Sequence, residues 1–446
     1  MRELFGMSIM KRITTVIIVI LLVTGCRLFG SEGSGETMTT EASFTEISVK
    51  QFAHNRLVFE GVQKDEKAAY IYDMHQKTLT RKQGDIDWQQ DDQRLRYLKD
   101  NRKLVLERSD NMERILLTDA DGNDEQLVQA PINSGLQYSV APNDASMLFW
   151  KIEGDETSLY LYDFIRDNEQ KVTELSDMLD HDDIAWSTNG KYVMVNKRSV
   201  YSVPEGKEVL ELRGGFASWS PTAAQLLIVE QDANNIKPPE DVDIAYGHRI
   251  IRLDMLSGEK AQLFPVKPDV EPLPLILDQP VWDQQGRYFA FITGSISGEQ
   301  IVYEKVHVMD VSGGFHHVEN EQNLRSSVIA GLSFDPSSNL FSYTAGGLLK
   351  VLHLPTQLSK VFDVYTQMQQ EDSHYLKYSD HDAWVLADGE IKRLSNDLEE
   401  KTVYRSSHEL RDFFVQSNGN QLLVIERDSD QYHLKLISLL EEETEK

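Results

Sequence analysis

Short apolar runs separated by turn residues dominate the chain from about residue 45 onward. Each run holds about five to eight apolar or alternating residues and is bounded by Gly, Asn, Asp, Ser or Pro. No stretch of about 12 residues in this part shows the 3.6-residue period that an amphipathic helix requires. Runs of this length between such boundaries are typical of β-strands. The pattern therefore predicts an all-β fold.

The predicted strands recur as a repeated unit of nearly constant length. In each unit an aromatic or branched anchor residue is followed by a short polar turn and a second β run, as in IAWSTNGKYVMV and PVWDQQGRYFAFI. The anchors are Trp88, Val140, Trp186, Trp219, Trp282, Phe334, Tyr378 and Val415, with a weaker copy at Phe52. Between the anchors at 88 and 415 there are seven intervals over 327 residues, about 47 residues each. That period is typical of the four-stranded blades of a β-propeller.

The repeat predicts a propeller of eight blades, with seven to nine possible because the first and last units are weak. An N-terminal strand at Phe44–Val49 is expected to complete the last blade, since closure of this kind removes exposed sheet edges. We expect the anchors to pack between neighbouring blades. A single cysteine allows no intramolecular disulfide, so this burial must supply stability, at about 2–3 kcal/mol for each aromatic side chain.

The unit that begins Trp219-Ser220-Pro221 carries the pattern W-S-P-x-x-x-x-L followed by a strand. Together with the x-I-Y-x-x-D-x-x-x-G pattern of the later strands, it resembles the TolB-type, WD-like bacterial propeller repeat. The resemblance covers about residues 45–440 and implies a propeller fold. It implies little about function, because the same repeat serves many different proteins.

The first 26 residues read as a targeting signal. Basic residues precede an apolar run of about 11 residues at Ile13–Val23, which is too short to span a bilayer stably and has the length of a signal-peptide core. The run ends in Val-Thr-Gly-Cys, which resembles a bacterial lipobox. The resemblance implies that Cys26 is lipidated and becomes the first residue of the mature chain. An uncleaved anchor helix with an incidental cysteine is the alternative interpretation.

Three segments follow from these patterns. Residues 1–25 are expected to be a lipoprotein signal peptide, and residues 44–446 to form the propeller. The segment between them, 26–43, holds the lipidated cysteine and is rich in Gly, Ser, Thr and Glu, a composition typical of a flexible tether. The sequence thus predicts a protein held by lipid on the extracytoplasmic face of the cell membrane.

Charge narrows the range of partners. With 45 basic against 72 acidic residues the formal net charge is −27. Nucleic acid is disfavoured as a partner, because its phosphates require clustered Lys and Arg. The single cysteine also excludes a metal site built from several thiolates. The oligomeric state is not indicated by any pattern.

A search for catalytic and metal motifs predicts no catalytic residue, no metal ligand and no cofactor. The segment 119–125 superficially resembles a calcium loop, but its Gly stands fourth rather than sixth and its flanks are strands, so a hairpin turn is favoured. The acidic stretch at 177–183 provides oxygen ligands for a divalent cation, yet a solvated loop is the favoured interpretation. A catalytic centre built from scattered loop residues stays open as an alternative.

Two long insertions interrupt the repeat at its fifth unit. One lies between the second and third strands at 232–247, and the other lies between the fifth and sixth units at 265–279. In an up-down-up-down blade, both connections emerge on the same face, together with the acidic loop at 177–183. Long loops on a rigid scaffold are where recognition usually resides.

The candidate binding residues on these loops combine rigid apolar elements with acidic side chains. They are Pro238, Pro239, Glu240, Asp241, Asp243, Tyr246, Asp182 and Asp183. Pro268, Pro272 and the apolar run 273–277 were expected to add to this rim. Packing of 273–277 over the adjacent blade is an equally supported alternative.

The leading functional prediction is a non-catalytic, membrane-anchored scaffold that binds another extracytoplasmic protein or a component of the cell envelope. Two alternatives stay open at this point. One is a hydrolase or lyase acting on extracellular glycan or peptide. The other is a sensor of a ligand or cation that signals to a membrane partner.

Overall fold

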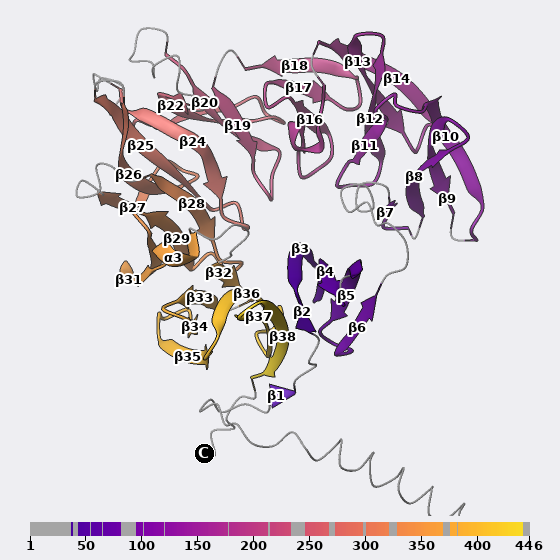
Figure 1. Cartoon of the computed structure of the whole chain (residues 1–446). Helices are drawn as coiled ribbons and strands as arrows, with labels where there is room; N and C mark the ends of the chain where they lie inside the picture. The colour runs from indigo at the N-terminus through magenta and orange to yellow at the C-terminus, as the bar shows by residue number, and fades with distance from the viewer. Residues whose placement is uncertain are drawn as a thin grey trace, which may run out of the picture. The chain divides into compact units, whose positions relative to one another are not determined.

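The computed structural model shows a chain built almost wholly from antiparallel β-sheets (Figure 1). It describes residues 37–38, 43–53, 55–64, 66–81, 95–100, 102–119, 121–176, 178–212, 215–232, 246–266, 273–297, 300–320, 328–368, 375–380 and 382–439. Within these ranges the helical elements are η1 (His181–Asp183) and α3 (Tyr365–Met368). No helix in the described part has the length and apolarity needed to cross a membrane. The predicted all-β fold is confirmed. The signal peptide, Cys26 and most of the predicted tether lie outside the described residues.

Within the described residues the strands form nine sheets, one more than the eight blades favoured by the repeat and within the predicted range of seven to nine. The first sheet contains β3 (Glu46–Ala53), β4 (Arg56–Gln63), β5 (Glu66–Asp73) and β6 (Thr78–Arg81). The second contains β7 (Leu95–Tyr97), β8 (Lys103–Ser109), β9 (Met112–Thr118) and β10 (Asp124–Pro131). The third contains β11 (Gln137–Val140), β12 (Ser146–Glu153), β13 (Glu156–Asp163) and β14 (Asn168–Leu175). The fourth sheet contains β15 (Ile184–Trp186), β16 (Tyr192–Val195), β17 (Ser199–Ser202) and β18 (Lys207–Glu211). The fifth contains β19 (Phe216–Trp219), β20 (Gln225–Glu230), β22 (Arg249–Asp254) and β23 (Lys260–Phe264).

The remaining four sheets follow the same plan with two additions. The sixth is β24 (Leu275–Trp282), β25 (Tyr288–Ser297), β26 (Gln300–Asp310) and β27 (Phe315–Asn320), extended by β21 (Tyr246–Gly247). The seventh is β28 (Ile329–Phe334), β29 (Leu340–Ala345), β30 (Leu348–His353) and β31 (Leu358–Asp363), and the eighth is β32 (Leu376–Tyr378), β33 (Ala383–Ala387), β34 (Glu390–Leu394) and β35 (Glu400–Arg405). The ninth is β36 (Glu409–Val415), β37 (Gln421–Asp428) and β38 (Gln431–Ser438), completed by β1 (Thr37–Met38) and β2 (Ser43–Phe44).

The ends of the described chain meet in the ninth sheet. Thr37 and Met38 pair with Ile437 and Leu436, and Phe44 pairs with Tyr432. An N-terminal segment therefore completes the last blade, as expected, but it is not Phe44–Val49. Most of that segment belongs to β3 of the first sheet instead, and the end of the predicted tether belongs to the propeller.

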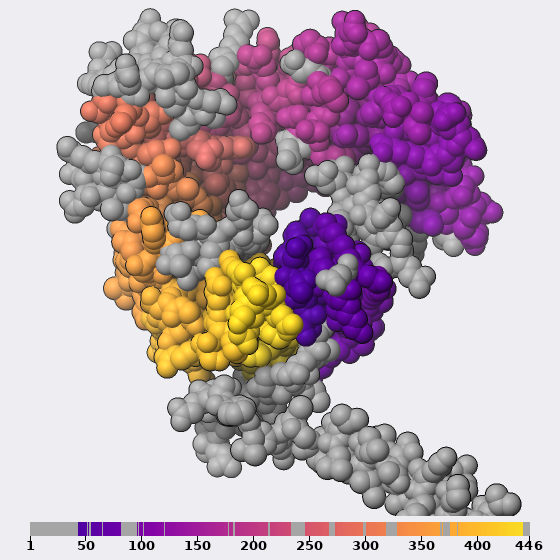
Figure 2. All heavy atoms as spheres, in the orientation of Figure 1, coloured from indigo at the N-terminus to yellow at the C-terminus, as the bar shows by residue number. Residues whose placement is uncertain are grey.

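Neighbouring sheets pack face to face through shared apolar cores. One core joins the ninth sheet to the first, where Phe44 and Phe59 meet Phe414 and Leu423. Figure 2 shows this contact between the yellow last strands and the indigo first sheet. Further cores join each successive pair from the second sheet to the ninth. Four-stranded sheets packed in this order are the blades of a β-propeller.

The predicted anchor Trp88 lies outside the described residues. The other predicted anchors pack in these cores, and three of them also make hydrogen bonds that the repeat did not reveal. The indole Nε1 of Trp186 donates to Ser139 Oγ at 2.9 Å, and that of Trp219 donates to the Ala185 carbonyl at 2.9 Å. Trp282 Nε1 donates to Ser218 Oγ at 3.1 Å. In each case the partner lies on the first strand of the preceding sheet. A half-buried indole thus fixes the spacing of two blades as well as burying its ring.

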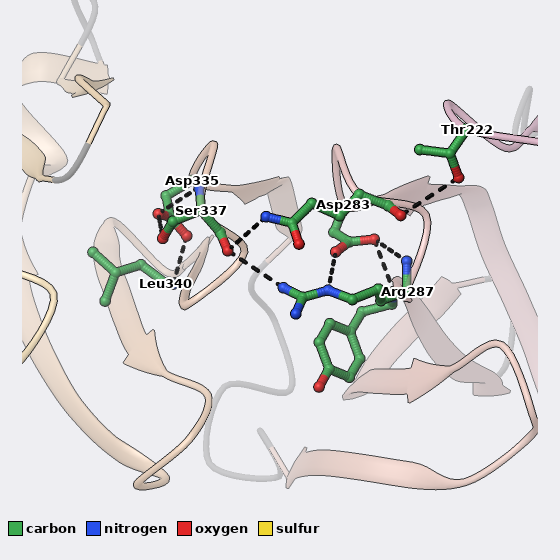
Figure 3. A network of polar contacts seen from close by, with 8 residues as sticks. Thr222, Asp283, Arg287, Asp335, Ser337 and Leu340 are labelled. Carbon is green, nitrogen blue, oxygen red and sulfur yellow. Dashed lines mark hydrogen bonds and ion pairs between the residues drawn. The ribbon is translucent and has the colours of Figure 1, made fainter. Parts of the chain in front are cut away.

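A belt of polar contacts links the turns between the first and second strands of successive sheets. Asn143 donates to the Asn189 carbonyl at 3.0 Å, Thr188 Oγ1 to the Ser220 carbonyl at 2.8 Å, and Thr222 Oγ1 to the Gln285 carbonyl at 3.4 Å. Further along, Arg287 donates to the Ser337 carbonyl at 3.3 Å (Figure 3). The remaining links of the belt run from Lys99 to Asp144, Asp380 to Ser417 and Ser417 to Asn55.

The belt defines two faces of the propeller. The turns after the first strands lie together on one face, and the turns after the third strands lie beside them. Met255 donates to the Ala224 carbonyl at 2.9 Å, for example, and Leu354 to the Asn339 carbonyl at 2.8 Å. We call this the turn face. The connections after the second and fourth strands lie at the opposite strand ends, because successive strands are antiparallel, and we call that the insertion face.

Candidate functional site

Of the predicted binding residues, the structure describes only a few. Pro238, Pro239, Glu240, Asp241 and Asp243 lie outside the described residues. Tyr246 is described and lies half-buried on β21. Asp182 and Asp183 belong to η1, and only the Asp183 side chain is described. The geometry of the candidate rim therefore rests on the bases of its loops.

The two long insertions end side by side. Tyr246 and Gly247, which close the first insertion, pair with Leu277 and Ile276, which follow the second. This short strand β21 adds a fifth strand to the sixth sheet. The prediction that both insertions share one edge of the insertion face agrees with this pairing, and the sequence did not show that their ends are joined through the backbone.

Close packing and a polar cluster hold the base of the first insertion in place. A Cβ at Gly247 would lie 2.4 Å from Val229 Cγ1 and 2.9 Å from the Glu230 carbonyl oxygen, so only glycine fits here. His248 is fully buried, and its Nδ1 accepts a hydrogen bond from the Asp232 amide at 3.0 Å. Arg249 donates to the Asp232 carboxylate at 2.7 Å. The insertion thus leaves the fifth sheet from a fixed platform.

The apolar run at 273–277 is not an exposed part of the rim. Leu273, Leu275, Ile276 and Leu277 are all nearly fully buried. Leu275 and Leu277 pack in the core shared by the sixth and seventh sheets, and Ile276 packs in the core shared by the fifth and sixth. The expectation of an apolar binding surface at this run is therefore wrong, and the alternative of packing over the adjacent blade is correct. The run also begins β24, so the second insertion is shorter than expected.

A long hairpin on the same face is not apparent from the sequence. Strands β25 and β26 contain 10 and 11 residues, and their ladder continues to Ser297 and Gln300. Ser295 Oγ donates to Glu304 at 2.5 Å near its tip. At Gly294 a Cβ would lie 2.4 Å from the Val302 carbonyl oxygen, so this glycine permits the local irregularity of the ladder. A run of ordinary strand length conceals such an extension in the sequence.

Tyr303 on this hairpin lies close to the irregular part of β24. Its ring packs with Tyr246 against the core between the sixth and seventh sheets. Burial, with a contribution from the Asp278 carboxylate, raises the pKa of the Tyr303 hydroxyl. Asp278 itself is exposed, in the irregularity between Leu277 and Val281. A protonated phenol beside an exposed carboxylate gives the rim a hydrogen-bond donor and an acceptor.

Several of the exposed apolar side chains lie on connections of the insertion face. Val266, Val328 and Tyr365 expose 56%, 62% and 58% of their surface, and Met368 is exposed as well. They follow the fourth strands of the fifth, sixth and seventh sheets. We define the insertion rim as these residues with Tyr246, Asp278 and the β25–β26 hairpin. Exposed apolar groups beside polar ones are typical of protein-binding surfaces.

The acidic loop at 178–183 makes its contacts with the third and fourth sheets. Trp150 Nε1 donates to the Leu179 carbonyl at 3.1 Å, and the His181 ring lies 5.3 Å from the Trp150 ring. Asp183 accepts the Asp180 amide at 3.0 Å, which closes the short helical turn. Asp183 is thus occupied in holding its own loop. Within the described ranges, no group of three or more His, Cys, Asp and Glu is placed to hold a metal ion.

Among the described residues, every carboxyl group with a shifted pKa has a pKa below its ordinary value. Hydrogen bonds from Ser158 and Lys151 lower the pKa of Glu153 to about 2 against a smaller effect of burial. Burial opposes ionisation of Glu426, but hydrogen bonds from Lys435, Ser406 and Tyr404 hold its pKa below the usual value. The same direction holds for the other shifted carboxyls: Glu60, Asp73, Asp100, Asp119, Glu174, Asp254, Asp310, Glu390 and Glu400. A depressed pKa suits an ion-pair or turn partner rather than a proton donor at neutral pH.

No family model matches the chain, and no curated protein sequence matches it. Among solved structures, TolB from Acinetobacter baumannii is 14% identical over 71% of this chain and 78% of its own, with a TM-score of 0.29. Oligogalacturonate lyase from Vibrio parahaemolyticus is 10% identical over 91% of this chain and 99% of its own, with a TM-score of 0.38.

A third similar structure is dipeptidyl peptidase 4 from Porphyromonas gingivalis, which is 12% identical over 76% of this chain, with a TM-score of 0.41. This chain spans 56% of the length of that peptidase chain. The sheets that the structure describes are those of a β-propeller protein, with the additional strand β21 on the sixth sheet.

Proposed function

We propose that this chain is an extracytoplasmic lipoprotein whose propeller is a non-catalytic scaffold that captures a protein or another envelope component at the insertion rim. The single observation that carries the proposal is the pairing of Tyr246 with Leu277, which joins the ends of both insertions on one edge. Insertions that start from this paired backbone can present a binding surface while the sheets beneath them stay packed. The lipobox-like segment ending at Cys26 supports attachment to the membrane.

The chemistry of the rim suits a partner with both apolar and basic groups. Val328 and Tyr365 supply exposed apolar area, and Asp278 supplies a nearby negative charge. The net charge of −27 favours a basic or neutral partner, since like charges across an interface oppose association. Exposed aromatic and aliphatic side chains are the usual anchors of such interfaces.

In vivo crosslinking tests this proposal. A photo-crosslinking residue at Val328 is expected to capture one defined partner, identified by mass spectrometry. With the probe at Val328, deletion of 234–244 and, separately, the substitution Tyr246→Ala should each reduce capture at least tenfold while the propeller stays folded, as judged by thermal unfolding. A matched probe at Ile165 on the turn face should capture none of that partner. Equal capture from Ile165, or unchanged capture after the deletion, would contradict the proposal.

A further inference from the structure

The N-terminal segment enters the propeller at one particular face. This point of entry decides which face of the propeller a lipid anchor on that segment would hold toward the membrane. Thr37 pairs with Ile437, and Ile437 pairs in turn with Leu422 at the start of β37. β37 begins directly after the turn-face loop 416–420, and the Leu439 amide donates to the Asn420 carbonyl at 2.9 Å. Thr37 therefore lies at the turn-face end of the ninth sheet. From there the chain runs toward the insertion face, where Phe44 pairs with Tyr432.

We propose that the lipid anchor holds the turn face toward the membrane and presents the insertion rim on the opposite, membrane-distal side. This inference rests on the lipidation of Cys26 contained in the proposed function. The chain that connects Cys26 to the propeller reaches Thr37 at the turn-face end of the ninth sheet. The partner then approaches the rim from the extracytoplasmic space rather than from the bilayer.

The length of the connection favours this orientation over the reverse one. Eleven residue steps separate 26 from 37, since 37 − 26 = 11, so the connection reaches about 36–40 Å when fully extended. As a flexible chain it has a root-mean-square reach of about 17–20 Å. To turn the insertion face toward lipid, it would have to pass the whole height of the ninth sheet. Eight-residue strands such as β38 make that height about 26 Å. The reverse orientation therefore needs a tether stretched beyond its root-mean-square reach.

The sequence allows a dye to be attached at one chosen position of the protein. Cys26 is the only cysteine, and lipid on its sulfur leaves an introduced cysteine as the only free thiol. Ile165 in a turn-face loop and Met178 on an insertion-face connection both adjoin the third sheet and expose 82% and 75% of their surface. Leu256 and Val266 form a second such pair at the fifth sheet, exposing 65% and 56%.

The experiment measures energy transfer from a dye on each introduced cysteine to a headgroup-labelled lipid, using the mature lipidated protein in vesicles. Ile165→Cys and Leu256→Cys should lie nearer the bilayer than Met178→Cys and Val266→Cys, by about the 26 Å sheet height. Equal or reversed distances would overturn the orientation. A flexible insertion of about 20 residues after position 36 should shrink the difference.

Detergent partitioning and the mass of the N-terminal peptide are measured on the same samples. Protein that carries lipid yet shows equal or reversed distances contradicts the orientation alone. Protein that carries no lipid on Cys26, and behaves like a Cys26→Ser variant, contradicts the anchor in the proposed function and the orientation with it. Loss of rim crosslinking with intact lipid and the expected distances would instead contradict only the scaffold role.

Discussion

Thr37 and Ile437 face each other across the outermost ladder of the ninth sheet, near opposite ends of the described chain. The pairing continues through Ser43 with His433 and Phe44 with Tyr432. It covers an edge of β38 that would otherwise be open to pairing with another chain. It also ties the first blade to the last, because Phe44 packs in the core that the two share.

Phe44→Ala should destabilise the whole propeller. Phe44 is 1% exposed, and its ring meets those of Phe59 and Tyr70 edge-on at 5.3 Å and 4.9 Å. Truncating a buried phenylalanine costs about 3–5 kcal/mol. The free energy of unfolding, measured by urea denaturation of the mature protein, should fall by that amount. Ile165→Ala, at an exposed turn, is the control and should change it by less than about 0.5 kcal/mol. A loss as small for Phe44→Ala would mean that the closure contributes little stability.

Gly247→Ala should displace β21 and weaken partner capture with little loss of global stability. A Cβ there would lie 2.4 Å from Val229 Cγ1 and 2.9 Å from the Glu230 carbonyl oxygen, so the two-residue strand must shift. Asp278→Ala removes an exposed side chain on β24 and should leave β21 in place, as judged by protection of the Gly247 and Ile276 region against hydrogen exchange. Full protection in Gly247→Ala would show that the neighbouring backbone accommodates the methyl group.

The repeat predicted the strands well because each unit carries its own local pattern. Trp186, Trp219 and Trp282 mark where first strands end, and the structure places all three at that position. The number of sheets was left between seven and nine because the first unit, around Phe52, has only a weak copy of the anchor and the last unit is weak as well. The strand that completes the last sheet was predicted at the wrong residues. Its pairing with Ile437 joins distant parts of the sequence, and no local pattern specifies such a pairing.

The structure describes the bases of the candidate rim, and most of the predicted binding residues lie outside the described ranges. Departures from the repeat correctly located the insertions whose ends meet at Tyr246 and Leu277. The same reasoning misjudged Leu273–Leu277, because an apolar run beside prolines has the same pattern whether it lies on a rim or starts a buried strand. The exposed Val328 and Tyr365 were missed since exposure of single apolar residues depends on which neighbours cover them.

Asp283→Ala should loosen the polar belt of the turn face. The Asp283 side chain is fully buried and accepts the Arg287 and Tyr288 amides at 2.6 Å and 2.9 Å (Figure 3). Its removal leaves the Arg287 and Tyr288 N–H groups without this acceptor, which costs about 1–3 kcal/mol each. Urea denaturation should therefore show a loss of about 2–6 kcal/mol. Asp121→Ala, in an exposed turn, should lie within about 0.5 kcal/mol of the parent protein. An equally small loss for Asp283→Ala would indicate that water replaces the carboxylate.

His307 should make the propeller sensitive to mild acid. Its ring is 5% exposed, stacks on Phe291 at 4.7 Å and shares a 2.8 Å hydrogen bond with Thr293 Oγ1. Burial, with a smaller effect of Lys305, lowers its pKa from 6.5 to about 4. The folded protein therefore favours the neutral ring. This contribution to stability is fully present above the unfolded pKa of 6.5 and is lost as pH falls through the folded pKa.

The free energy of unfolding should consequently fall between pH 7 and pH 4 by on the order of 3 kcal/mol more than in a His307→Gln variant. Glutamine keeps a polar group near Thr293 but binds no proton in this range, so the difference between the two curves isolates the histidine. Unfolding by urea at half-unit pH steps measures both curves. His408→Gln, at an exposed position, serves as the control and should follow the parent protein. If the His307→Gln curve instead parallels the parent at every pH, then His307 accepts a proton in the folded state as readily as in the unfolded chain, and the acid sensitivity has another source.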